Sequence, residues 1–159
     1  MSKFFRRGKT KIYWVPTIVS ATLIPTAAEV LAGQNLSASI ADISGFEFQN
    51  SPIAAPDLST TFTGTIPGED TVQEPNLVFN EDDTTNPLHA TLSKGTKGFI
   101  VLFYKGTAGA SPAAADKAEV WEVQSTGPYR EYSMGNDVAR WGVRFAVPGK
   151  PPNFDAALT

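Results

Sequence analysis

Residues 14–58 read WVPTIVSATLIPTAAEVLAGQNLSASIADISGFEFQNSPIAAPDL, and they carry more structural information than any other stretch of the chain. Thr26 and Glu29 have the S/T-x-x-E spacing of a capping box, in which each side chain binds a backbone N–H at the start of a helix. Gly33 stands where a left-handed C-cap is expected. The spacing therefore predicts a short helix over 27–32.

Short strands are predicted on both sides of this helix, because apolar and β-branched residues recur between turn signals. Pro67-Gly68 is typical of a turn, so we expect the strands before and after it to form a hairpin with a long tip. The run FIVLFY at 99–104 predicts a strand that is buried on both faces. The predicted strands cover residues 12–22, 35–49 (broken by a turn at Ser44-Gly45), 58–66, 76–80, 99–104, 118–124 and 138–147.

A second short helix is expected after Asn86, which would be its N-cap, with Pro87 at the first helical position. Gly95 would end it. The predicted fold is mainly β, a sandwich or barrel with one or two short helices. We expect a single domain over 12–147, preceded by a basic arm (1–11) and followed by a Pro-rich tail (148–159) that lacks a core-forming pattern.

Charge is distributed unevenly along the chain. Five of the thirteen cations lie in the arm, and no acid precedes Glu29; the cations are Lys3, Arg6, Arg7, Lys9 and Lys11. The rest of the chain has eight cations against sixteen acids. This pattern favours an arm that docks on an acidic surface of another copy or a partner. A soluble, disordered terminus and a secretory signal with its apolar region at 12–24 are the alternatives.

The sequence holds no recognisable catalytic or cofactor site. Cysteine is absent and His89 is the single histidine, which removes thiol chemistry and most zinc geometries. Glu119 and Glu122 are three residues apart in a predicted strand, so they should lie on opposite faces. The acids Glu81, Asp82 and Asp83 form either a solvated run near a helix start or a cation site. We expect that the protein is not an enzyme and that it binds no cofactor and no metal.

Aromatic residues suggest one further possibility, a sugar-binding face, although strand aromatics more often belong to a core or an interface. The candidates are Trp14, Tyr104, Trp121, Tyr129, Tyr132 and Trp141. The corresponding alternative function is a secreted, monomeric β-sandwich module that binds carbohydrate or protein.

The sequence also resembles a known family, the major tail tube proteins of long-tailed phages that infect actinobacteria. The segment 14–58 carries the resemblance most fully, although Ala55 stands where the family often has Thr. Further strings, in the same order and spacing, are FTGTIPGEDTV (62–72), NLVF (76–79), GTKGFIVLFYKG (95–106) and WGVRFAVPGKPP (141–152).

This resemblance implies a structural virion protein with a β-sandwich fold. It implies six-membered rings that stack around a tape-measure protein, meet tail-end proteins and leave a channel for transient DNA passage. The protein would be assembled in the host cytoplasm, without membrane insertion. In this setting the basic arm is expected to join one ring to the next. Three acids of the predicted hairpin connection, Glu69, Asp70 and Glu74, are expected to face the channel, where they would keep DNA from adhering.

Overall fold

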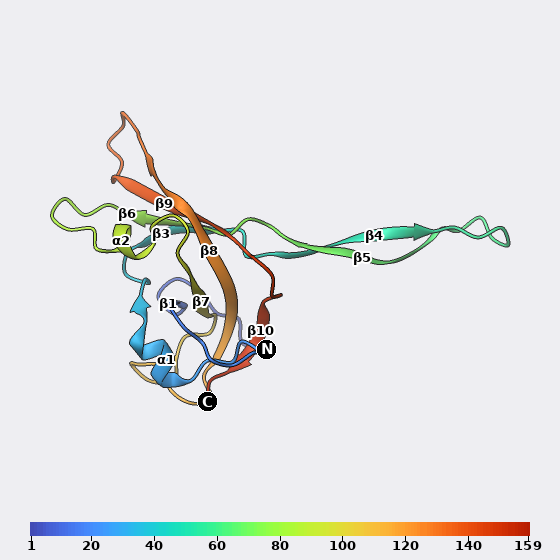
Figure 1. Ribbon diagram of the computed structural model, residues 1–159, viewed down its shortest axis with the longest axis horizontal. Helices are drawn as coiled ribbons and strands as arrows, with labels where there is room; N and C mark the ends of the chain where they lie inside the picture. The colour runs from blue at the N-terminus through green and yellow to red at the C-terminus, as the bar shows by residue number, and fades with distance from the viewer.

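The computed structural model describes all 159 residues, and the mainly β fold with two short helices is confirmed (Figure 1). The elements in chain order are β1 (Lys11–Val15), α1 (Ala27–Ala32), β2 (Gln34–Asn35), β3 (Ile40–Ser44), β4 (Phe48–Ala55), β5 (Gly64–Val72), β6 (Asn76–Asn80), α2 (Leu88–Thr91), β7 (Lys97–Phe103), β8 (Lys117–Glu131), β9 (Arg140–Ala146) and β10 (Asn153–Ala157).

Eight of the strands form one antiparallel sheet in the order β2-β1-β7-β8-β9-β6-β3, with β10 paired to β8. The long strand β8 belongs to both ends of this sheet. Its first half pairs with β7 and β10, and its second half pairs with β9 from Gln124 onward, with a register shift between Ser125 and Pro128. Such an irregularity bends a strand and increases its twist. The two ends of the sheet therefore lie in different layers (Figure 1).

The core consists of two apolar clusters, one on each face of β7. Ile100 and Leu102 belong to the first cluster, which also holds Trp121 and Trp141. Val101 and Phe103 belong to the second cluster, which is covered by α1 and the end of the chain. The prediction of a strand buried on both faces is confirmed.

The capping box of α1 is also confirmed, because the Thr26 hydroxyl accepts from the Glu29 N–H and the Glu29 carboxylate accepts from the Thr26 N–H. The left-handed conformation predicted for Gly33 is wrong. Its backbone is extended, and a Cβ there would stand 2.2 Å from the carbonyl oxygen of Trp14. Glycine is needed at this position for close approach of two backbones.

The first predicted strand is shorter than expected and ends at Val15. β1 lies between β2 and β7, so its backbone donors are used on both sides. Pro16 has no N–H to contribute and ends the strand. Residues 16–24 instead cross the second cluster as a loop, with Ile18 and Leu23 buried.

The predicted hairpin is wrong in its pairing. Strand β5 pairs with β4, whereas β6 pairs with β3 and β9. Pro67-Gly68 lies inside β5 rather than in a turn, opposite an irregularity of β4 at Pro52. A Cβ on Gly68 would stand 2.1 Å from the carbonyl oxygen of Ser51, so the dipeptide marks a bulge and not a chain reversal.

The second helix is limited to Leu88–Thr91, so it ends before Gly95. Asn86 is not its N-cap: that position is held by Pro87, and no side chain caps the helix. The Asn86 side chain instead closes the preceding loop, donating to the carbonyl oxygen of Asp82 and accepting from its N–H.

The C-terminal tail contributes to the core, contrary to the sequence analysis. Residues 153–157 form β10 against the first half of β8, and Ala156 and Leu158 are buried in the second cluster. The backbone of Thr159 exchanges hydrogen bonds with Pro25 and Ala27 at the start of α1.

Candidate assembly surface

The most prominent surface feature is an arm formed by the β4–β5 hairpin, residues 48–72, which projects far from the body (Figure 1). No residue of this segment is buried. Its large apolar side chains are exposed by half or more; they are Phe48, Ile53, Leu58, Phe62 and Ile66. A two-stranded hairpin is only marginally stable by itself in water. The arm therefore has the character of a surface that is covered in an assembly.

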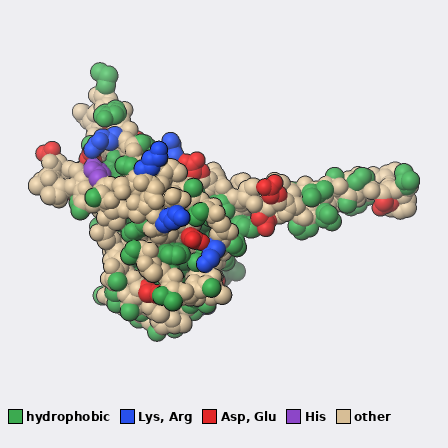
Figure 2. Space-filling model, in the orientation of Figure 1, with side chains coloured by type: hydrophobic (Ala, Val, Ile, Leu, Met, Phe, Trp, Pro, Cys, Tyr) green, Lys and Arg blue, Asp and Glu red, His purple; other side chains and the backbone are tan.

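The arm carries no Lys or Arg, and its acids are Asp57, Glu69 and Asp70. Figure 2 shows hydrophobic and acidic side chains along it and no basic ones. Asp57 is used locally, because its carboxylate accepts from the Ser59 and Thr60 N–H groups and the Ser59 hydroxyl. These bonds lower the pKa of Asp57, with the Ser59 side chain as the main cause.

The three acids expected at the channel are separated by the structure. Glu69 and Asp70 are consecutive in β5, so they point to opposite faces of the arm. Asp70 accepts a hydrogen bond from Asn50 on β4. Glu74 lies after the strand, next to the body, with its Oε1 3.7 Å from Nε of Arg144.

The N-terminal arm is partly folded on its own chain. Arg6 donates to the carbonyl oxygen of Tyr104, and Lys11 donates to the Thr107 hydroxyl at 2.7 Å. The remaining cations of the N-terminal arm, Lys3, Arg7 and Lys9, take part in none of the three salt bridges. Phe5, before the folded part, is exposed.

The end of the sheet formed by β3, β6, β9 and the second half of β8 has one face on the core. Neither apolar cluster covers its other face, called the bare face. Trp141, Val143 and Phe145 of β9 point into the first cluster. Between them, Gly142 and Arg144 point the other way, and Arg144 is exposed. At the other end of the sheet, both faces of β1 and β7 are covered by the two clusters.

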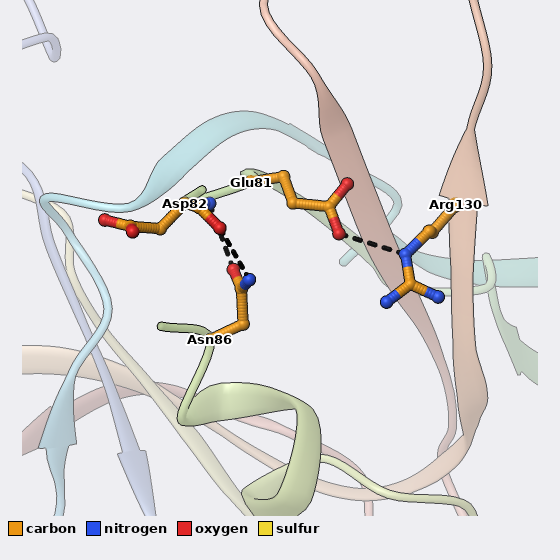
Figure 3. Close-up of polar contacts among 4 residues, drawn as sticks. All are labelled: Glu81, Asp82, Asn86 and Arg130. Atoms are coloured by element: carbon orange, nitrogen blue, oxygen red, sulfur yellow. Dashed lines mark hydrogen bonds and ion pairs between the residues drawn. The ribbon is translucent and has the colours of Figure 1, made fainter. Parts of the chain in front are cut away.

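The acidic cluster forms local bonds in place of a common site (Figure 3). Glu81 accepts from Nε of Arg130 at 2.9 Å, which raises the pKa of the guanidinium. Asp82 accepts from the N–H groups of Thr84 and Thr85, and these bonds lower its pKa. No group of three possible metal ligands comes together anywhere in the molecule.

Glu119 is the one carboxylate with a raised pKa, and the main cause is its partial burial. Its Oε1 accepts from the Trp121 indole at 2.8 Å. Glu119 pairs with Leu102 and Glu122 with Phe99. These two β7 residues face opposite clusters, so the two acids lie on opposite faces, as predicted.

The aromatic residues considered for a sugar-binding face do not form one. Trp14, Trp121 and Trp141 are buried in the first cluster. Tyr132 is exposed in the loop after β8. His89 stacks edge-on against Trp141, with ring centroids 4.3 Å apart, which explains the single histidine as a packing residue. Neither helix is long and apolar enough to span a membrane.

The sequence did not predict that residues 48–72 project as an arm with exposed apolar side chains. One signal was available: residues 48–72 contain prolines at both 52 and 67. Two prolines in facing strands are compatible with an isolated ribbon whose outer edges bind no neighbour.

Comparison with known proteins agrees with this geometry. A family model described as phage tail tube protein matches residues 1–159. No curated protein sequence matches the chain. Among solved structures, a chain of the anti-feeding prophage baseplate, 6-fold symmetrised, aligns with a TM-score of 0.65 at 8% identity, covering 97% of this chain and 98% of that one.

Two other solved structures show the same fold. A chain from the sheath/tube terminator of the extracellular contractile injection system PVC, in its extended state, aligns with a TM-score of 0.64 at 11% identity over 96% of this chain and 98% of that one. A chain from the tail of an empty GTA particle, refined with C6 symmetry, aligns with a TM-score of 0.54 at 9% identity over 98% of this chain and 100% of that one.

Proposed function

Because the chain belongs to the phage tail tube protein family, a family of structural tail proteins, we propose that its copies form rings that stack into the tube of a virion tail. Rings of six are the proposed number. Two of the similar structures are described with sixfold symmetry, which supports this number.

The exposed β4–β5 arm is the observation that carries the proposal. Burying a Leu, Ile or Phe side chain contributes roughly 1.5–3 kcal/mol. The arm offers five such side chains that its own chain leaves exposed. Contact with a neighbouring copy would cover them and would hold the ribbon straight. We therefore assign the arm to a contact between copies.

The basic N-terminal arm is proposed to join successive rings. Arg6 and Lys11 already bind their own chain, so the contact would be made by residues 1–5 together with Arg7 and Lys9. The exposed Phe5 would add apolar area, and the acidic body of the next copy would attract the cations.

The bare face of β3, β6, β9 and β8 is the proposed wall of the channel through which DNA passes. Of the two ends of the sheet, only this one has an uncovered face. Glu74 lies beside it, whereas Glu69 and Asp70 lie on the arm. The proposed role in keeping DNA from adhering is therefore assigned to Glu74 alone.

We also propose that the tube surrounds a tape-measure protein and meets tail-end proteins. The proposal includes assembly in the host cytoplasm and an origin in a long-tailed phage of actinobacteria. All of these rest on the sequence resemblance. The rival is a secreted monomeric module that binds carbohydrate or protein. Its sugar-binding face lacks support because three of the six candidate aromatic residues, Trp14, Trp121 and Trp141, are buried.

Sedimentation velocity over a range of protein concentrations tests the proposed assembly. The wild-type chain should form large species, and the double variant Leu58→Asp/Phe62→Asp should stay monomeric with an unchanged circular dichroism spectrum. Both side chains contact nothing in the core, so the fold should persist.

The variant Val19→Asp is the control for an added surface charge, because Val19 is an exposed apolar residue of the body. Assembly of the double variant to the wild-type extent would contradict the role of the arm. A wild-type chain that stays monomeric at every concentration would contradict the proposed function.

A further inference from the structure

Two arginine–glutamate pairs lie on opposite faces of the same end of the sheet. Arg130 pairs in register with Trp141, whose side chain points into the core, so Arg130 lies on the core side. Its partner Glu81 directly follows β6, and Figure 3 shows the two side chains pointing toward each other. Arg144 lies between two core residues of β9 and points to the bare face, where Glu74 approaches it.

On the bare face, the side chain of Tyr129 holds Arg144 against the sheet. Tyr129 pairs in register with Gly142 and reaches across it, and its hydroxyl donates to Oδ1 of Asn76 at 3.0 Å. The guanidinium carbon of Arg144 lies 4.6 Å from the centroid of the tyrosine ring. One side of the guanidinium therefore contacts an aromatic ring, and one edge meets the carboxylate of Glu74.

The other arginine of this face also stands beside an acid. Arg140 of β9 pairs in register with Glu131 of β8. Cross-strand partners share a face, and opposite charges at such positions attract. Both arginines of the bare face thus have a glutamate as their neighbour.

We propose that Glu74 and Tyr129 shield Arg144, so that the channel wall binds DNA phosphates weakly. This inference rests on the proposed tube function. An unshielded arginine would offer a planar fork of donors to phosphate oxygens. Repeated in every copy along the tube, it would bind passing DNA by releasing counterions. A guanidinium that stacks on Tyr129, with the Glu74 carboxylate 3.7 Å from its Nε, presents less net charge to a phosphate.

The test uses assembled tubes of the full chain and a short DNA duplex that fits the channel, with cosedimentation measured at several salt concentrations. Glu74→Gln frees Arg144 with little change in shape, since both side chains are about half exposed. Bound DNA should increase at low salt and return to the wild-type level at high salt. The slope of log affinity against log salt should steepen by roughly 0.9 for each arginine that gains a phosphate contact.

Two further variants make the test specific. Glu81→Gln removes the same charge from the pair on the core side and should leave DNA binding unchanged. The double variant Glu74→Gln/Arg144→Gln should restore wild-type binding, because the freed arginine is gone.

The inference would be overturned by equal effects of Glu74→Gln and Glu81→Gln, or by no effect of Glu74→Gln. Loss of tubes in Glu74→Gln would also overturn it, since Glu74 would then belong to a contact between copies. If the wild-type chain forms no tubes in electron micrographs, the proposed function itself has failed. If tubes form normally but the variants bind DNA to the same extent as the wild type, only the shielding of Arg144 is contradicted.

Discussion

The ring of Tyr129 lies so close to the backbone of Gly142 that a Cβ atom on Gly142 would stand 2.6 Å from Cζ and from the hydroxyl oxygen of the tyrosine. Glycine at position 142 therefore makes room for an aromatic side chain on the bare face of the sheet. Because Arg144 stacks on the ring of Tyr129, the glycine that makes room for this ring also affects where Arg144 lies.

Gly142→Ala should displace Tyr129 and break its hydrogen bond to Asn76. Overpacking of this kind costs roughly 1–3 kcal/mol, which urea unfolding can measure. Gly149→Ala is the matched control, because nothing lies within 4 Å of a Cβ there. In a Tyr129→Ala background the cost of Gly142→Ala should shrink, since the clashing ring is absent. An equal cost in both backgrounds would show that the strain comes from elsewhere.

Thr26→Ala should lower the free energy of unfolding by about 1 kcal/mol, because it removes the side-chain cap of α1. Thr26→Ser keeps the hydroxyl and serves as the control.

The hydrogen bonds from the Thr26 and Val19 N–H groups, Thr26 first, lower the pKa of Glu29 in the folded chain. This stabilisation is present above the unfolded pKa of Glu29 and is lost as the pH falls through its folded pKa. Glu29→Gln should remove that acid-side dependence; an unchanged pH profile would contradict the account.

Glu119 should affect the free energy of unfolding with a pH dependence opposite to that of Glu29, and Glu119→Gln tests this. Partial burial raises the pKa of Glu119 in the folded chain, so its charged form is less favourable there than in the unfolded chain. Stability is therefore lost as the pH rises from the unfolded pKa through the folded one. The neutral amide keeps an acceptor for the Trp121 indole and should raise Tm at neutral pH but not at acid pH. A lower Tm at neutral pH would show that the carboxylate is stabilising.

Leu158→Ala should destabilise the fold by about 2–5 kcal/mol, the usual cost of creating a cavity at a buried leucine. Only 3% of Leu158 is exposed, within the second cluster. Phe154→Ala, in the same terminal segment but 79% exposed, should have little effect on the monomer. Thermal unfolding of both variants checks this. A small effect of Leu158→Ala would mean that the C-terminal segment is not part of the folded core.

The features that the sequence predicts correctly depend on nearby residues. The capping box needs only Thr26 and Glu29, and the apolar run at 99–104 is itself sufficient to indicate a strand between two apolar layers. Trp141, Val143 and Phe145 alternate with Gly142 and Arg144, and this period of two marks the core face of β9. Each of these signals involves residues close together in the sequence, so it can be recognised without knowledge of the fold.

The features that the sequence did not predict depend on distant partners. Pro67-Gly68 has the composition of a turn, and only the opposite strand at Ser51 shows that it is a bulge. The C-terminal residues lack a clear apolar period, and their burial depends on the free edge of β8. The contacts of Arg144 involve Tyr129 of β8 and Glu74 of the connection between β5 and β6, which no spacing in the sequence links to β9.

Cryo-electron microscopy of the purified full-length chain tests the central claim most directly. The account predicts tubes of stacked rings in which the β4–β5 arm lies on a neighbouring copy and the face bearing Tyr129 and Arg144 lines the channel. The account would be contradicted by single-chain particles at every concentration, or by tubes in which the arm extends freely into solvent.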